Sequence, residues 1–203
     1  MLKRTIDLVL SMLLLSLLAV PLILIGLCIR LETAGPAIFR QKRVGRWGAE
    51  FNILKFRTMR QATAADTRQV TVGNDARITV LGRFLRRFKI DELPQLVNVA
   101  RGDMSLIGPR PEVSRYVAHY PPGIRAIVLS VRPGITDPAS IRFRNENELL
   151  ATFDDPESAY VEKILPIKLN YYVDYVRNQS LLLDLKIALR TITAVLIPSK
   201  SEI

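Results

Sequence analysis

The sequence predicts an α/β fold that is mostly helical, with a small β-hairpin or sheet and an N-terminal helix embedded in a membrane. Three observations support this: an uncharged apolar run near the start, two β-prone runs around a glycine turn, and helical apolar spacing over much of the remainder. We expect residues 1–35 to form the membrane helix and residues 36–203 one compact domain, with amphipathic helices at the membrane interface.

Composition narrows the chemistry that the chain can perform. Apolar residues make up 49% of its 203 residues although 24% are charged, and the net charge of +10 favours anionic partners such as phosphate, anionic lipid or nucleic acid. One cysteine and one histidine exclude an internal disulfide, a cysteine-rich zinc site and a multi-histidine metal site. Any chemistry therefore depends on Asp, Glu, Arg, Lys, Ser or Thr.

The first element is the uncharged apolar segment 8–29. It has the length of about 20 residues that a helix needs to cross a bilayer core, and it is too long for a signal peptide. Basic residues precede and follow it, as cytoplasmic flanks do, and Pro21 near its middle removes a helical hydrogen bond. A kinked helix that enters and leaves by one membrane face fits these features, and so does an ordinary crossing helix that contains proline. The basic residues of the flanks are Lys3, Arg4, Arg30, Arg40, Lys42 and Arg43.

A hairpin and a basic helix are expected next. Residues 37–59 contain two β-prone runs around a turn at 45–48, which predicts a β-hairpin. A polar loop or weak helix is expected over 60–76. Residues 77–90 place apolar side chains at helical spacing with arginine and lysine between them, so they predict a basic amphipathic helix.

A second helix is expected to begin at Asp91, because Pro94 is tolerated only in a first helical turn. Gly102 follows the apolar stripe of this helix as the residue that ends it. Residues 102–112 are then expected to form a turn, a short strand and a proline-rich corner.

Shorter elements are expected in the C-terminal half. Residues 112–120 favour a short helix that is broken at 121–123, and residues 131–136 predict a tight turn. The last helical region, 166–197, has Ser180 as a candidate N-cap. Its final part is very apolar, which fits either a core helix or a helix lying on the membrane.

Asp91 and Glu92 are adjacent acids that directly follow a cluster of cations. As a helix N-cap, Asp91 would be kept ionised by the free N–H groups and partial positive charge there, which lower the pKa of an aspartate. Such a carboxylate can hold Mg²⁺ or attack phosphorus. Neighbours differ by about 100° around a helix, so the two acids are expected to have different roles. Helix capping with surface salt bridges is the alternative interpretation of the pair.

Two arginines lie in stiff corners, Arg110 within 108–111 and Arg132 within 131–134. Arginine binds phosphate through two parallel hydrogen bonds, and phosphoryl transfer depends on positioning and charge neutralisation. Each corner by itself is also typical of a structural turn.

Together, KFRTM at 55–59, DELPQLVNVARGDMSLIGPRPE at 91–112 and VRPGIT at 131–136, after a kinked apolar segment, resemble the small bacterial polyprenyl-phosphate phosphoglycosyl transferases, a family of monotopic sugar transferases. The resemblance covers nearly the whole chain, and the run at 91–112 is its most specific part. It implies transfer of a phospho-sugar from a UDP-sugar to polyprenyl (undecaprenyl) phosphate with release of UMP, the first membrane step of glycoconjugate synthesis. It also implies a re-entrant helix and a domain on the cytoplasmic face of the bacterial inner membrane.

The resemblance assigns roles to single residues. It implies a ping-pong reaction with Mg²⁺, in which Asp91 forms a covalent phospho-sugar intermediate and touches the metal. Glu92 is implied to assist in placing the metal or in deprotonation. Arg86 and Arg110 match positions that bind substrate phosphate. Further candidates for substrate binding are Lys55, Arg57, Asp103, Pro111 and Arg132.

Two departures from the family pattern leave details open. Val20 precedes the kink proline where many relatives carry serine, and this leaves the detailed geometry of the kink open. Residues 137–148 lack the Gly-aromatic pair that often follows VRPGIT, which leaves the sugar open.

The expected partners are a UDP-sugar, polyprenyl phosphate and membrane lipid. The sequence contains no legible nucleic-acid-binding module, so nucleic acid is not expected. The competing class is a membrane-anchored basic binding or scaffold protein without catalysis. The oligomeric state is left open, with a homodimer among the alternatives.

Overall fold

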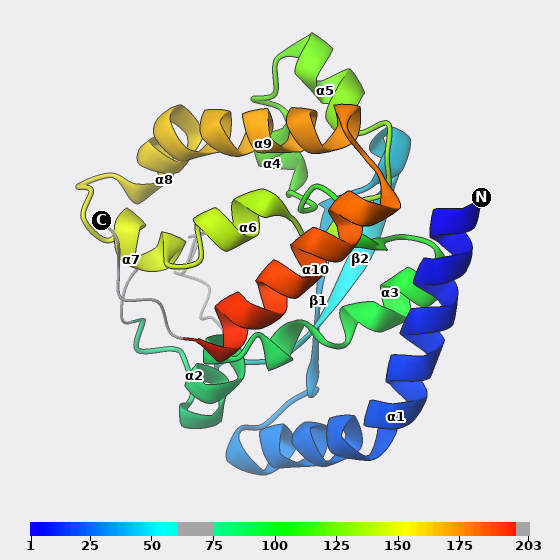
Figure 1. Cartoon of the computed structure of the whole chain (residues 1–203). Helices are drawn as coiled ribbons and strands as arrows, with labels where there is room; N and C mark the ends of the chain where they lie inside the picture. The colour runs from blue at the N-terminus through cyan, green and yellow to red at the C-terminus, as the bar shows by residue number, and fades with distance from the viewer. Residues whose placement is uncertain (61–74, 198–203) are drawn as a thin grey trace.

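The computed structural model describes residues 1–60 and 75–197, and these form a mostly helical protein with two small two-stranded sheets (Figure 1). This agrees with the predicted balance of helix and strand. The loop or weak helix expected over 60–76 falls largely on residues 61–74, which lie outside the described residues.

Helix α1 (Leu2–Glu32) contains the whole apolar run and changes direction along its length (Figure 1). Pro21 lies inside it, where the missing N–H removes a helical hydrogen bond, so the predicted kink is confirmed. Among the described residues, α1 is the one helix whose length and composition are sufficient to cross a membrane. Most of its large apolar side chains lie on the outside of the protein.

Polar side chains form hydrogen bonds between the N-terminal end of α1 and the rest of the chain. Arg4 donates hydrogen bonds to the carbonyls of Val99 at 2.6 Å and Ala100 at 3.0 Å. Asp7 is buried, and its carboxylate accepts a hydrogen bond from the hydroxyl of Ser105 at 2.8 Å. The charged start of the apolar helix is therefore bound directly to the globular part.

Arg57 forms hydrogen bonds to the C-terminal end of α1. Its guanidinium donates to the carbonyls of Thr33 at 2.6 Å and Ala34 at 2.7 Å, just beyond the last helical turn. The Glu32 carboxylate also accepts a hydrogen bond from the N–H of Leu81 at 3.1 Å. Both ends of the apolar helix are thus held by one and the same domain.

Strands β1 (Ile38–Val44) and β2 (Glu50–Phe56) form the predicted antiparallel hairpin. The turn between them contains Trp47 at a φ of 60°, in the left-handed region that favours glycine. The hairpin passes through the middle of the protein (Figure 1), and its second strand places Lys55 beside the turn that precedes α3.

Helix α2 (Val80–Arg87) confirms the predicted basic amphipathic helix within 77–90. The hydroxyl of Thr79 caps it by accepting a hydrogen bond from the N–H of Gly82 at 2.9 Å. The chain then turns sharply, because Lys89 adopts a left-handed φ of 56°.

The prediction that a helix begins at Asp91, with Asp91 as its cap, is wrong. Asp91 lies inside the 3₁₀ turn η2 (Ile90–Glu92), and α3 (Gln95–Arg101) begins only after Pro94. The N–H of Leu93 bonds to the carbonyl of Ile90 at 3.1 Å, and this i−3 bond is typical of a 3₁₀ turn and not of an α-helix.

Helix α3 ends, as predicted, at Gly102, whose φ is 97°. Strand β3 (Ser105–Ile107) follows and pairs in parallel with β4 (Gly134–Thr136). The tight turn expected around the second of these strands is therefore only partly correct. A Cβ on Gly134 would lie 2.1 Å from the nitrogen of Gly108, so the close approach of the two backbones requires glycine.

The remaining helices complete the domain (Figure 1). They are α4 (Ser114–Val117), α5 (Pro122–Val128), α6 (Pro138–Arg142), α7 (Glu146–Leu150), α8 (Pro156–Ala159), the π-helical turn η3 (Tyr160–Ile164), α9 (Leu165–Arg177) and α10 (Leu181–Leu196). The cluster of buried apolar residues that contains Val44 also includes residues of α4 to α9. The short helix expected over 112–120 is α4, which already ends at Val117, and the expected break at 121–123 is where α5 starts, because proline fits a first helical turn. Ser180 caps α10 as predicted and divides the region 166–197 into two helices.

Helix α10 lies on the surface and is not a core helix. Its buried side includes Asp184, which accepts hydrogen bonds from Lys3 at 2.6 Å and from the hydroxyl of Tyr175 at 2.7 Å. Its other side exposes a row of large apolar residues, which are Leu181, Leu182, Leu185, Leu189, Ile192 and Leu196. Of the two alternatives for this segment, the structure favours the surface helix.

Candidate active site

Glu92 lies at the centre of a buried cluster of opposite charges. Lys55 Nζ lies 2.9 Å from Glu92 Oε1, and the Arg110 guanidinium donates to both carboxylate oxygens, at 2.5 and 3.2 Å. Burial by itself would raise the pKa of Glu92, but the charges of Arg110 and Lys55 outweigh it and hold that pKa well below its usual range. Glu92 is therefore a fixed anion with both oxygens engaged.

Asp91 has different surroundings, although it is the next residue. It is also buried, but its Oδ1 has no hydrogen-bond partner among the described residues. Burial, together with the charge of Glu92, raises the pKa of Asp91 against the opposing cations Lys55, Lys89 and Arg86. The prediction that a helix start lowers this pKa is wrong, because Asp91 lies within a buried turn and does not cap a helix.

The cations around the two acids come from separate parts of the chain. Lys55 belongs to β2, Arg86 to α2 and Arg110 to the proline-rich corner after β3. Arg86 Nε donates to the hydroxyl of Thr58 at 2.8 Å, and the charge of Asp91 opposes the burial that lowers the pKa of this arginine. Burial lowers the pKa of Lys55 to about 8 despite the neighbouring Glu92. The site thus combines positive charge from three elements around two adjacent carboxylates, one of which has an oxygen without a partner among the described residues.

The other sequence candidates make different contacts. Arg57 binds the end of α1, as described above, and its side-chain hydrogen bonds within the described residues go to Ile29, Thr33 and Ala34 and not to either acid. Arg132 Nε donates to the carbonyl of Gly102 at 2.7 Å. Asp103 accepts a hydrogen bond from Asn98 at 3.1 Å. These contacts support the frame around the site, and a role of these residues in substrate binding stays a prediction.

Pro111 belongs to a network that the sequence did not reveal. Arg43 on β1 donates to the Pro111 carbonyl at 3.1 Å and pairs with Glu112 at 3.3 Å. The N–H of Val44 bonds to the carbonyl of Glu112 at 2.9 Å. The hairpin therefore fixes the corner that carries Arg110. In the sequence Arg43 counted only as a flanking charge, since nothing local indicates a partner so far along the chain.

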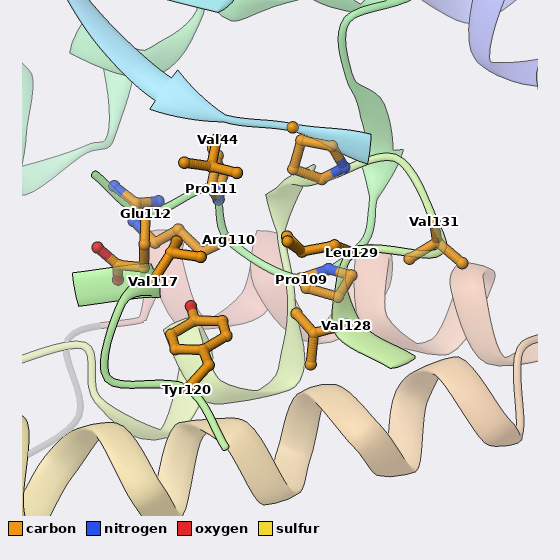
Figure 2. A pocket seen from close by; sticks show the side chains of 12 residues that line it. Val44, Pro109, Arg110, Pro111, Glu112, Val117, Tyr120, Val128, Leu129 and Val131 are labelled. Atoms are coloured by element: carbon orange, nitrogen blue, oxygen red, sulfur yellow. The ribbon is translucent and has the colours of Figure 1, made fainter. Parts of the chain in front are cut away.

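A small pocket lies behind this corner (Figure 2), bordered by Arg110, Tyr120 and Leu129 among others. Its volume of about 10 Å³ is at the lower limit for a single water molecule. It is too small to hold a nucleotide or a sugar, and neither Asp91 nor Glu92 lines it.

The donor set suits Mg²⁺ at one carboxylate. The described residues contain no group of three or more His, Cys, Asp or Glu side chains that could enclose a metal ion. Magnesium is commonly held by one or two carboxylates together with substrate phosphate and water, so a closed cage is not required. The unpartnered Oδ1 of Asp91 fits that role, whereas both oxygens of Glu92 are engaged with cations.

Comparison with known proteins adds a second line of argument. The model of the bacterial sugar transferase family matches residues 1–198. A UDP-glucose:undecaprenyl-phosphate glucose-1-phosphate transferase of Caulobacter vibrioides is 42% identical over 198 residues, which cover 96% of this chain and 69% of the relative. A protein of Escherichia coli with the same description is 35% identical over 195 residues, covering 95% of this chain and 39% of the relative.

A relative whose name specifies a different sugar has the same percentage identity to this chain as the Escherichia coli protein. A UDP-N-acetylgalactosamine-undecaprenyl-phosphate N-acetylgalactosaminephosphotransferase of Aeromonas hydrophila is 35% identical over 196 residues, which cover 96% of this chain and 43% of the relative. The chain thus spans less than half of the length of two of these three relatives.

Proposed function

The chain belongs to the bacterial sugar transferase family, and on this basis we propose that it is a polyprenyl-phosphate phosphoglycosyl transferase. It moves a phospho-sugar from a UDP-sugar to polyprenyl phosphate and releases UMP. The observation that carries this proposal is the pair of unlike carboxylates near Lys55, Arg86 and Arg110, of which Glu92 is held by ion pairs and Asp91 has an oxygen without a partner among the described residues. A dianionic diphosphate and an anionic lipid phosphate both require such a cationic surface.

Asp91 is the nucleophile in this proposal. Its carboxylate oxygen attacks the sugar-bearing phosphorus of the UDP-sugar and forms a P–O bond, while the bond from that phosphorus to the UMP oxygen breaks. The electron pair of the broken bond leaves with UMP. An oxygen of polyprenyl phosphate then attacks the same phosphorus, and Asp91 departs as a carboxylate. Oδ1 of Asp91 has no hydrogen-bond partner among the described residues, so no bond from this oxygen to the protein has to break before the attack.

Glu92 organises the cations. Its two oxygens orient Arg110 and Lys55, so the guanidinium and the ammonium are held in place before the substrate arrives. Such preorganised charge stabilises the oxygens of a transferring phosphoryl group without reorganisation during the reaction. Mg²⁺, held by Asp91 and the substrate diphosphate, would add a further positive charge there.

The way α1 is held supports a re-entrant arrangement at the cytoplasmic face of the inner membrane. Arg4 and Asp7 at one end and Glu32 at the other end contact the same domain, and the kink lies between them. A helix that crossed the bilayer would need its ends on opposite sides, about 30 Å apart. The exposed apolar row of α10 adds a second surface suited to lie against the membrane.

Cysteine labelling tests this topology. In a variant that lacks the native cysteine through Cys28→Ser, we expect Leu2→Cys and Arg125→Cys to react with a membrane-impermeant maleimide from the cytoplasmic side alone. Inverted and right-side-out membrane vesicles separate the two sides. Reaction of Leu2→Cys from the periplasmic side, with Arg125→Cys reacting from the cytoplasm, would replace the re-entrant model with a crossing helix.

The pH dependence of turnover should reflect Lys55. Since burial lowers its pKa to about 8, the lysine loses its charge as the pH rises through that value, and the site then attracts phosphate less strongly. We expect UMP release to decline with a midpoint near this pH. In Lys55→Arg the guanidinium stays charged over the whole range, so its decline should move to higher pH. Identical profiles for the two proteins would show that another group is responsible.

Product analysis tests the function itself. The protein in membrane or detergent, with Mg²⁺ and polyprenyl phosphate, should release UMP from at least one UDP-sugar and form the polyprenyl-diphosphate-sugar. A ping-pong reaction also predicts exchange of labelled UMP into the UDP-sugar without any lipid acceptor. Absence of UMP release across a panel of UDP-sugars would favour the binding or scaffold class.

A further inference from the structure

Gln95 is a buried amide without a hydrogen bond. It is the first residue of α3, its exposed fraction is 0%, and neither Oε1 nor Nε2 has a partner within residues 1–60 and 75–197. Buried polar side chains in native proteins nearly always have a partner, and each exception needs an explanation. An amide enclosed without one weakens the fold, so a residue of this kind points to a partner that joins it later.

Asn98 shows that the same helix does satisfy a buried amide. It also has an exposed fraction of 0%. Its Oδ1 accepts from the N–H of Leu54 at 3.0 Å, and its Nδ2 donates to the carbonyl of Asn52 at 2.8 Å and to Asp103 at 3.1 Å. The amide of Asn98 thus stabilises the fold through its hydrogen bonds, whereas the protein leaves the amide of Gln95 unpaired.

The position of Gln95 relates it to Asp91. From η2 through Leu93 and Pro94 the backbone stays helical up to α3, so the two residues lie about one turn apart. Because this segment begins as a 3₁₀ turn, with about three residues per turn, residues four apart lie a little more than one turn from each other. Side chains on a helix also lean toward its N-terminus, which directs Gln95 toward the turn that contains Asp91.

Two unpartnered polar groups therefore belong to one helical turn: Asp91 Oδ1 and the amide of Gln95. They do not bond to each other, although a carboxylate oxygen and an amide N–H are complementary. A group that fits between them must accept a hydrogen bond from the amide and must be linked to the carboxylate. A phosphoryl group bonded to Asp91 has both properties, because its non-bridging oxygens are strong acceptors.

We propose that Gln95 is a substrate-contacting residue whose side-chain N–H donates to a non-bridging oxygen of the phosphoryl group that Asp91 takes from the UDP-sugar. This inference rests on the proposed function. It adds an uncharged donor to the cationic site and places it on the side of the nucleophile, where the phosphoryl group forms its new bond. The contact exists only once that group has arrived, so it favours the transition state and the intermediate over the bound substrate.

The variant Gln95→Met gives this proposal an unusual signature, because methionine has a similar length and volume but no amide. If the amide has no partner in the resting protein, its removal should raise the melting temperature in the absence of substrate. Removal of one donor to the transferring group should lower kcat of UMP release about 10- to 100-fold, with the KM for the UDP-sugar changed by less than about 3-fold. Stability and activity would then change in opposite directions.

Asn98→Leu is the matched control. It removes a buried amide from the same helix, but one that makes three hydrogen bonds, so its melting temperature should fall. The proposal is overturned if Gln95→Met melts at or below the wild-type temperature, since the amide then has a partner such as a buried water. It is equally overturned if kcat of Gln95→Met stays within about 2-fold of wild type.

The two failures can be told apart. If the wild-type protein releases no UMP, the proposed function fails, whatever Gln95 does. If wild type is active and Gln95→Met is equally active, the proposed function stands and only the assignment of Gln95 is lost. The melting temperature without substrate is independent of catalysis and reports on the unpaired amide alone.

Discussion

Asp91→Asn is expected to abolish UMP release and to leave the protein at least as stable as wild type. The amide cannot attack phosphorus, so the loss of turnover should reach about 10⁴-fold or more. Burial and the charge of Glu92 raise the pKa of Asp91, which means that the folded protein disfavours its ionised form. A carboxyl whose pKa is raised by folding weakens the fold as the pH rises above about 4, the value in the unfolded chain. Asparagine removes that penalty at neutral pH.

Three measurements check this expectation. UMP release reports turnover, thermal unfolding reports stability, and intact mass after incubation with UDP-sugar reports the covalent phospho-sugar adduct. Asp154→Asn, at an exposed position, is the control for a change of charge alone. The nucleophile assignment is wrong if Asp91→Asn retains more than about a tenth of wild-type turnover, or if it still acquires the adduct.

Elements whose signals are local were predictable from the sequence. The hairpin, the basic helix α2, the end of α3 at Gly102 and the cap at Ser180 depend on turn residues and on spacing within a few positions. Strand β4 was taken for a turn because its pairing with β3 joins segments far apart in the chain. No local pattern distinguishes a three-residue buried strand from part of a corner.

The candidate site likewise has some features that the sequence predicts locally and others that depend on contacts between distant segments. The sequence run predicted Asp91 and Glu92 as the reactive pair, and that role stays a prediction. The structure places Lys55 and Arg110 in ion pairs with Glu92. The sequence did not predict that Asp91 and Glu92 differ so strongly in their charged and hydrogen-bonded neighbours. Their pKa values depend on burial and on cations from three other elements, which adjacency in the sequence cannot reveal. Gln95 stands in the same run but could not be singled out, because its lack of a partner is a property of the fold.

Glu92→Gln is expected to have the opposite effect on stability from Asp91→Asn. The substitution keeps the shape of the side chain but leaves Arg110 and Lys55 without their shared anion inside the protein. Breaking a buried ion pair on one side costs about 3–5 kcal/mol, since the remaining charge is desolvated without compensation. Glu50→Gln is the control, because its pair with Lys42 is exposed and 3.5 Å long, and such pairs contribute about 0–1 kcal/mol. Urea unfolding of the three proteins measures the difference.

The pH dependence of the stability difference between wild type and Glu92→Gln shows whether the lost charge or the changed packing causes it. The cations hold the pKa of Glu92 well below its usual range in the folded protein. A carboxyl of this kind contributes stability that is fully present above the pKa of about 4.3 in the unfolded chain and is lost as the pH falls through the lower folded value. Wild type should therefore exceed Glu92→Gln in stability at neutral pH, and the gap should narrow in acid. A gap that stays constant with pH would assign the loss to packing and not to charge. If it narrows while Asp91→Asn stays stable and inactive, the adjacent acids have separate roles: Glu92 fixes the cations, and Asp91 is left free to react.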